Sequence, residues 1–167
     1  MSGVTVREAR PDELDAVGRL VAGAYVAAGV LDAEDGPYLE EIRDAARRAA
    51  HCPVLVAVEE GSGEILGSVT YVPAAGNPYA ELEVEGEAGF RMLGVAPVAQ
   101  RRGIGGILVQ ACVERARAAG RVGLAISTGG DMVPAHRLYE GLGFVRAPER
   151  DFDPVPGVHL VAFTLAL

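Results

Sequence analysis

The chain has 167 residues, half of them hydrophobic, and a net charge of −8 at neutral pH. This length suits one domain, expected over residues 4–167, and no apolar run is long enough to predict a membrane-spanning helix. The acidic balance disfavours nucleic-acid binding, and because all 15 basic residues are arginine, a lysine Schiff base and a lysine-containing phosphate loop are both excluded. The first residues lack the apolar segment of a signal peptide, so we expect a cytoplasmic protein with no membrane partner.

The charged residues are unevenly distributed along the chain. Residues 1–90 hold 17 acidic residues and 6 arginines, whereas residues 91–167 hold 6 acidic residues and 9 arginines. This pattern is compatible with a cationic ligand at the first part and a polyanion at the second, although halves of a sequence need not be halves in space. Cys52 and Cys112 have no metal or redox spacing. His51 and His159 have no companions at ligand spacing, so no metal is predicted.

The first half of the chain predicts a strand, two helices and a hairpin. Residues 4–9 alternate as a strand does, and residues 10–13 combine proline with acidic residues as helix starts do. The inner face of this first helix is expected to carry Leu14, Val17, Val21 and Tyr25. Residues 37–50 form a second expected helix, and residues 54–72 a hairpin with a glycine-containing turn. The second helix is expected to turn Tyr38, Ile42, Ala45 and Ala49 inward.

The second half continues with strands and two further helices. Residues 80–84 and 88–95 are expected to be a strand pair that turns at residues 85–87. The following helix should end at Gly120, with Ile104, Ile107, Leu108, Ala111 and Cys112 buried. After this helix we expect a strand over residues 122–127, a helix over residues 134–143, and strands over residues 144–152 and 158–167. This order predicts one mixed sheet with helices on its faces.

Residues 100–106 read QRRGIGG and directly precede the helical pattern of residues 107–120. The start of a helix offers unpaired N–H groups and about half a positive charge, for which phosphate oxygens are natural partners. Glycine lets the backbone approach a ligand closely, and Arg101 and Arg102 add positive charge. The pattern therefore predicts a loop that binds a diphosphate.

Of two other interpretations of this loop, one fails and one stays open. A dinucleotide fingerprint needs G-x-G-x-x-G, but counting from Gly103 places Leu108 at the third glycine, so that match fails. A glycine-rich turn could also merely let a strand and a helix pack closely, at a cost of about 1 kcal/mol against alanine.

The motif Gln100-Arg101-Arg102-Gly103-Ile104-Gly105 resembles the acetyl-coenzyme A (acetyl-CoA) signature of the GNAT N-acetyltransferase superfamily, Q/R-x-x-G-x-G/A. Residues 91–97 (RMLGVAP) resemble its central strand, and residues 136–145 (HRLYEGLGFV) resemble its L-Y-x-x-x-G-F segment. The resemblance covers nearly the whole chain. It implies the α/β (α+β) acyltransferase fold, with about seven strands in a mixed central sheet and about four helices.

The resemblance also implies where acetyl-CoA binds as a co-substrate. The diphosphate would lie on the amides of residues 101–106, after Gln100, and the pantetheine arm would pair with the strand around residues 93–95. A main-chain N–H near Leu93 or Gly94 would polarise the thioester carbonyl. His136 could contact the cofactor or tune Tyr139, although a solvated helix histidine is the simpler interpretation. The implied cofactor-binding set is Leu93, Gly94, Val95, Gln100, Arg101, Arg102, Gly103, Ile104, Gly105, Gly106 and His136.

Tyr139 matches the family's general acid, a protonated phenol that gives a proton to the departing thiolate. A tyrosine that only packs in the core is the alternative. The family's glutamate base would fall on Gly89, so that carboxylate is missing, and Glu87, two residues earlier, is the predicted substitute. Glu85, Glu83 and Glu81 share its parity, and all of these acids could instead be a solvated edge. Met132 replaces an asparagine that many members carry.

The leading interpretation is an acetyl-CoA-dependent N-acetyltransferase that acts on a small cationic amine or a peptide amine by direct attack on the thioester. The acidic residues Asp32, Glu34 and Asp35 favour a cationic acceptor. A non-catalytic acyl-CoA-binding sensor or scaffold and a nucleotide-binding fold are the other candidates. Residues 158–167 could pair across a homodimer.

Overall fold

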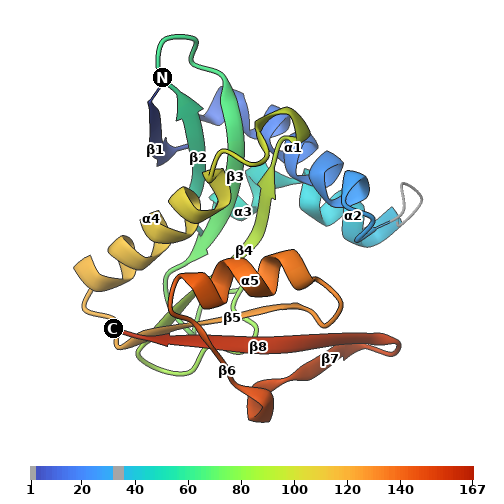
Figure 1. Ribbon diagram of the computed structural model, residues 1–167, viewed down its shortest axis with the longest axis vertical. Coiled ribbons are helices and arrows are strands. Elements are labelled where there is room, and N and C mark those ends of the chain that lie inside the picture. The colour runs from blue at the N-terminus through green and yellow to red at the C-terminus, as the bar shows by residue number, and fades with distance from the viewer. Residues whose placement is uncertain (1–2, 32–35) are drawn as a thin grey trace. The chain divides into compact units, whose positions relative to one another are not determined.

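The computed structural model describes residues 3–31 and 36–167 (Figure 1). The chain divides into two compact units: residues 1–71 with 92–111, and residues 72–91 with 112–167. Strand β4 (Glu87–Val95) begins in the second unit and ends in the first, whereas helix α4 (Ile104–Ala118) begins in the first and ends in the second. A single domain over residues 4–167 stays a prediction.

The strands of the first unit follow the order β1-β2-β3-β4. Strand β1 (Val4–Glu8) pairs antiparallel with β2 (Val54–Glu59), which in turn pairs antiparallel with β3 (Ile65–Val72). Five of the six β2 residues are buried, which explains their continuous apolar run. The strand and the hairpin predicted from this part of the sequence are therefore confirmed.

Helix α1 (Leu14–Ala27) follows a short 3-10 turn, η1 (Pro11–Glu13), and supplies the core of the first unit. Val17 packs with valines of β2, and Val21 packs with residues of the next helix. Both valines are fully buried, as the helical spacing predicts, whereas Leu14 and Tyr25 lie at the margin of the core and are half-buried.

The single helix predicted over residues 37–50 is wrong, because two helices occupy this segment, α2 (Gly36–Arg43) and α3 (Ala45–Ala49). Asp44 lies between them, and its carboxylate accepts a hydrogen bond from the Arg47 N–H at 3.1 Å. An aspartate that caps a new helix competes with continuation of the preceding one. As a result Ile42 and Ala45 are buried as predicted, but Tyr38 and Ala49 are exposed.

Arg48 on α3 is buried to 1% exposure and links α2 to the sheet. Its guanidinium donates to the carbonyls of Glu41 and Ile42, at 2.7 and 2.8 Å, and to Thr70 Oγ1 at 3.1 Å. Arg48→Leu would leave these acceptors buried without their donor, so we expect it to lower the free energy of unfolding by about 3 kcal/mol. Urea denaturation measures this, with the exposed Arg47→Leu as the control; equal effects of the two would contradict the assignment.

The strands of the second unit follow the order β4-β5-β8-β6, with β7 beside β8. Strand β5 (Gly123–Gly129) runs parallel to β4 and antiparallel to β8 (Val158–Ala166). Strands β6 (Val145–Arg146) and β7 (Phe152–Val155) also pair with β8. Because β8 has partners on both edges, the predicted homodimer would need a surface other than a free edge of this strand.

Two strand predictions in the second unit are wrong. Residues 80–84 form no strand, because Glu83 accepts the N–H groups of Glu81 and Leu82 within the loop. Residues 144–152 are interrupted by a 3-10 turn, η3 (Pro148–Arg150), which separates β6 from β7. Together with helix α5 (Val133–Gly141), the part of the chain described here holds eight strands and five α-helices. The predicted mixed α/β class is confirmed.

Helix α4 begins directly after Gly103 and stops before Gly120, as predicted, and Gly120 adopts a positive φ of 72°. Ile107, however, is 37% exposed. The buried positions are Ile104, Leu108, Val109, Cys112, Val113 and Ala116. Ile104, Leu108 and Cys112 are therefore buried as predicted, whereas Ile107 is exposed and Ala111 is only half-buried. None of the helices in residues 3–31 and 36–167 has both the length and the apolar character needed to cross a membrane.

Candidate active site

The glycine-rich loop forms the cap of α4 in the first unit. Gly103 accepts the N–H of Ile107 at 3.1 Å, which makes it the capping residue, and its φ is 75°. Arg101 also has a left-handed φ, of 68°. A glycine cap brings no side-chain oxygen, so the first-turn N–H groups of Ile104, Gly105 and Gly106 have neither a side-chain cap nor a helical carbonyl as partner. Three N–H groups at the positive end of a helix suit a diphosphate.

The polar side chains of the loop lie at its surface. Gln100, Arg101 and Arg102 are all exposed. Arg102 Nη1 donates to Glu59 Oε2 at 3.1 Å, so this guanidinium is held at the end of β2. An exposed pair of this kind contributes little to stability, and Arg102 can exchange its partner for an anionic ligand at small cost.

The end of β4 is shaped by two unusual residues in the first unit. Met92 has φ 54°, a strained value for a residue with a side chain, and it interrupts the strand's regular pleat. Gly94 lies against α1, since an added Cβ would be 3.1 Å from the Cα of Val21. Leu93 and Val95 are half-buried. The structure thus places the predicted pantetheine-binding residues on a distorted strand end whose backbone α1 supports.

Tyr139 lies on α5 in the second unit and is only 5% exposed. Its ring centroid is 5.7 Å from that of Phe90 and 5.9 Å from those of Phe144 and Phe163. Burial, and to a lesser extent the Cys112 thiol, raise the pKa of Tyr139 above its ordinary value. The phenol therefore keeps its proton throughout the physiological pH range, as a proton donor must.

His136 lies one turn before Tyr139. Its Nε2 is 2.9 Å from the carbonyl oxygen of Gly129, which can only accept, so Nε2 carries a proton and donates it. Its ring centroid is 5.3 Å from that of Phe163. His136 therefore ties α5 to the end of β5 and is not a solvated histidine. Met132, at the start of α5, accepts a hydrogen bond from Thr128 Oγ1 at 3.5 Å.

The Glu87 carboxylate is engaged by an arginine. Arg150 donates to its two oxygens at 2.7 and 3.1 Å, and the Val84 N–H donates at 3.0 Å. Burial alone would raise the pKa of Glu87, but these hydrogen bonds outweigh burial and hold the pKa below its ordinary value. A carboxylate so stabilised is a weak base, and the base role of Glu87 stays a prediction.

We expect Glu87→Gln to lower the melting temperature by about 3 °C at pH 7, since the Arg150 guanidinium loses its countercharge. The lowered pKa means that the stabilisation is present above the unfolded carboxyl pKa of about 4.3 and is lost as the pH falls through the folded value. The variant and the wild type should therefore converge in acid in thermal melts. A pH-dependent loss of activity without destabilisation would instead support Glu87 as the base.

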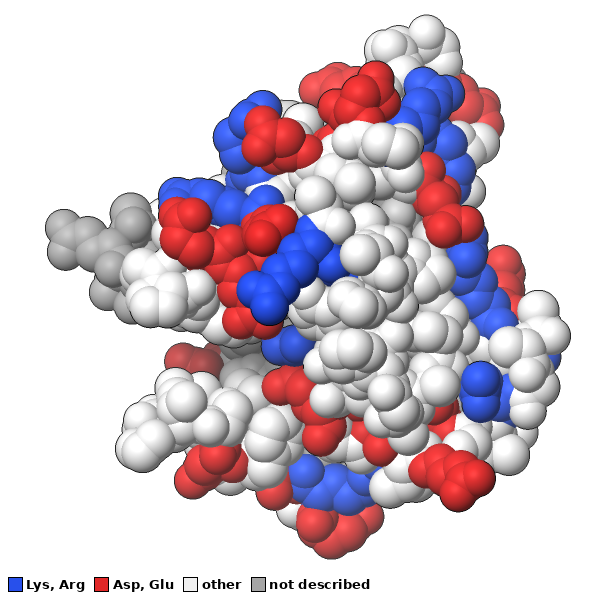
Figure 2. Space-filling model, turned by 180° about the vertical axis from the view of Figure 1, so that it is seen from behind, with Lys and Arg blue, Asp and Glu red and all other residues white. Residues whose placement is uncertain are grey.

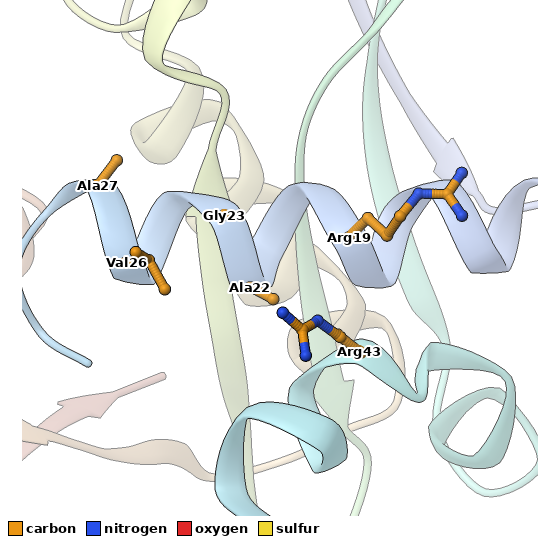
Figure 3. A pocket seen from close by; sticks show the side chains of 6 residues that line it. All are labelled: Arg19, Ala22, Gly23, Val26, Ala27 and Arg43. Atoms are coloured by element: carbon orange, nitrogen blue, oxygen red, sulfur yellow. The ribbon is translucent and has the colours of Figure 1, made fainter. Parts of the chain in front are cut away.

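A shallow pocket of about 450 Å³ lies between α1 and α2 in the first unit (Figure 3). Small apolar residues of α1 form its floor. The Arg43 side chain extends from α2 toward Ala22. Arg19 is paired with Asp15, and Arg43 with Glu40 at 2.7 Å. The lining residues are Arg19, Ala22, Gly23, Val26, Ala27 and Arg43. No predicted site residue lines this pocket.

The remaining titratable groups of the described residues form no metal cluster. Cys52 and Cys112 are buried free thiols, and burial raises the pKa of Cys112 to about 12. His159 lies 2.7 Å from Asp153, but no three potential ligands converge within residues 3–31 and 36–167. On the face shown in Figure 2, arginines lie beside acidic side chains. The acidic residues Asp32, Glu34 and Asp35 fall outside the described residues.

The mixed α/β fold is that of acyl-CoA-dependent transferases. The family model of the acetyltransferase (GNAT) family matches residues 20–144, well over half of the sequence. The chain therefore belongs to the GNAT family, whose members use acetyl-CoA, and it is an N-acetyltransferase.

Solved structures of similar fold extend over the whole chain. A GCN5-related N-acetyltransferase from Kribbella flavida is 25% identical, with a TM-score of 0.70 and 98% of each chain covered. Ribosomal-protein-alanine N-acetyltransferase from Brucella melitensis is 21% identical, with a TM-score of 0.70, covering 98% of this chain and 99% of that one. The yncA protein of Salmonella typhimurium, described with its cofactor acetyl-CoA, is 18% identical, with a TM-score of 0.66, covering 98% and 94%. No curated protein matches the sequence.

Proposed function

We propose that the protein transfers the acetyl group of acetyl-CoA to a primary amine, either a small cationic amine or a peptide amine, by direct attack on the thioester. The glycine cap of α4 carries this proposal, because it presents first-turn N–H groups without a competing side-chain acceptor. The amides of residues 101–106 would hold the diphosphate, beside Gln100. The backbone of residues 93–95 would pair with the pantetheine arm.

The proposed reaction is balanced in protons and bonds. A neutral amine attacks the thioester carbonyl, forming the C–N bond, and collapse of the tetrahedral intermediate breaks the C–S bond. An N–H near Leu93 or Gly94 would stabilise the oxyanion. Tyr139 would donate its proton to the coenzyme A thiolate, and the phenolate would recover a proton from the nitrogen by way of solvent. One further proton, that of the initial ammonium group, is released.

The next question is which charge the acceptor carries besides the amine that is acetylated. The loop before β4 is rich in glutamate and suits a cationic amine, whereas the pocket of α1 and α2 is rimmed by Arg19 and Arg43 and suits an anionic group. We favour the cationic acceptor because Asp15 and Glu40 already pair with these two arginines.

A panel of amines tests the proposal through release of free thiol from acetyl-CoA. The panel contains a polyamine, an alkylamine with no charge beyond its own ammonium group, an amino acid and a peptide with a free N-terminus. We expect the highest kcat/KM for an acceptor that carries a second positive charge, and a clear preference for amines without one would overturn that choice. Thermal stabilisation by acetyl-CoA without turnover of any amine would favour a binding module. Stabilisation by NAD or ATP but not by coenzyme A would favour a nucleotide-binding fold.

A further inference from the structure

Gly89 leaves a space on β4 that the carboxylate of Glu83 fills. A Cβ added to Gly89 would overlap Oε1 of Glu83 and would lie 2.6 Å from the carbonyl oxygen of Ala125 on β5. Glu83 belongs to the loop that precedes β4, six residues earlier in the chain. The absence of a side chain at residue 89 therefore lets a carboxylate from another segment lie directly over the strand.

The Glu83 carboxylate is held in place by its own loop. Its Oε2 accepts the N–H groups of Glu81 and Leu82, at 2.7 and 3.1 Å. The carbonyl of Leu82 in turn accepts a hydrogen bond from Arg150 at 2.6 Å. One carboxylate oxygen is thus anchored while the other, Oε1, lies over Gly89. A functional carboxylate needs this kind of fixed orientation.

Glu83 adds a negative charge beside two ion pairs. Arg91 pairs with Glu81 at 2.8 Å, and Arg150 pairs with Glu87 at 2.7 Å. The two pairs cancel within themselves, so these five side chains together carry one excess negative charge, that of Glu83. Such an excess attracts an ammonium group to the Glu83 carboxylate, the group that can accept its proton.

Glu83 and Tyr139 lie on opposite faces of β4. Successive residues of a strand point to opposite faces, and Tyr139 packs on Phe90 while Glu83 lies over Gly89. In the described residues of the second unit, β4 pairs with β5 only through Glu87 with Gly123 and Ala88 with Leu124. The carboxylate therefore lies where the pairing of β4 with β5 ends.

We propose that Glu83 is the proton acceptor for the amine substrate. This inference rests on the proposed acetyl transfer and names the base of that reaction. The carboxylate takes one proton from the bound ammonium group, which leaves a neutral amine whose lone pair can form the C–N bond. Glu83 then releases that proton to solvent, while Tyr139 supplies the proton that the thiolate needs.

Glu83→Gln tests the proposal, because glutamine keeps an oxygen for the N–H groups of Glu81 and Leu82 but is no longer a base. At pH 7 we expect kcat to fall about 100-fold. The deficit should shrink as the pH rises to about 9.5, because the ammonium group, with a pKa near ~10, then loses its proton without help. The exposed Glu140→Gln serves as the control and should keep wild-type kcat. Acetyl-CoA affinity and melting temperature should change little in either variant.

Three results would overturn the assignment of Glu83. These are full activity of Glu83→Gln at pH 7, a loss that stays constant across pH, and a loss that instead follows Glu85→Gln. Failure of the proposed function itself gives a different result, since the wild-type protein would then turn over no amine of the panel.

Discussion

Replacing Tyr139 by phenylalanine is expected to lower kcat for acetyl transfer about 100-fold while leaving acetyl-CoA affinity unchanged. Phenylalanine keeps the ring that packs on Phe90, Phe144 and Phe163, so the fold loses only a hydroxyl. The thiolate then departs without a proton donor. Steady-state thiol release measures kcat, and calorimetric titration with acetyl-CoA measures the affinity.

The pH profile gives a second check on Tyr139. Because burial raises its pKa above the ordinary value of about 10, loss of the phenol proton should cause no fall in rate up to about pH 10. Tyr38→Phe, a change at a tyrosine that is 39% exposed, should leave kcat unaffected. Wild-type kcat in Tyr139→Phe would make Tyr139 a packing residue only.

Gly105→Pro is expected to weaken acetyl-CoA binding by 10-fold or more. Proline is tolerated in the first turn of a helix, where its missing N–H has no helical partner, but it removes one of the donors proposed for the diphosphate. A hydrogen bond to a charged group contributes about 1.5–3 kcal/mol, which corresponds to about 10- to 100-fold in the dissociation constant. Calorimetric titration measures the change.

Gly105→Ala is the matched control, because it keeps the backbone N–H. We expect its acetyl-CoA affinity to remain within about threefold of the wild type, with circular dichroism confirming that both variants are folded. Equal affinities of the proline and alanine variants would show that the N–H of residue 105 does not hold the diphosphate.

The sequence predicted those parts of the candidate site that depend on the backbone of one short segment. Residues 100–106 specify the glycine cap of α4 locally, and the loop has the conformation that its glycines predict. A family resemblance predicted Tyr139 as the general acid, but it did not predict which residues surround the phenol. Phe90 and Phe163 are far from it in sequence, and only packing brings their rings together and raises its pKa.

The carboxylates show most clearly what the sequence left undecided. Alternation along an assumed strand selected Glu87 and placed Glu81, Glu83 and Glu85 on one face. Residues 80–84 are a loop, however, and side-chain hydrogen bonds set its path. Which glutamate meets Arg150 and which lies over Gly89 depends on that path and on partners up to 63 residues away.

Hydrophobic period and glycine placement act over a few neighbouring residues, so they were enough to predict the fold class, the order of most elements and the glycine cap of α4. The break at Asp44, the exposure of Ile107 on α4, the pairing of Glu87 and the position of Glu83 became clear only from the three-dimensional structure. Each of these depends on which groups, often far apart in the sequence, compete for the same hydrogen bond or the same space. Local periodicity does not predict the outcome of that competition.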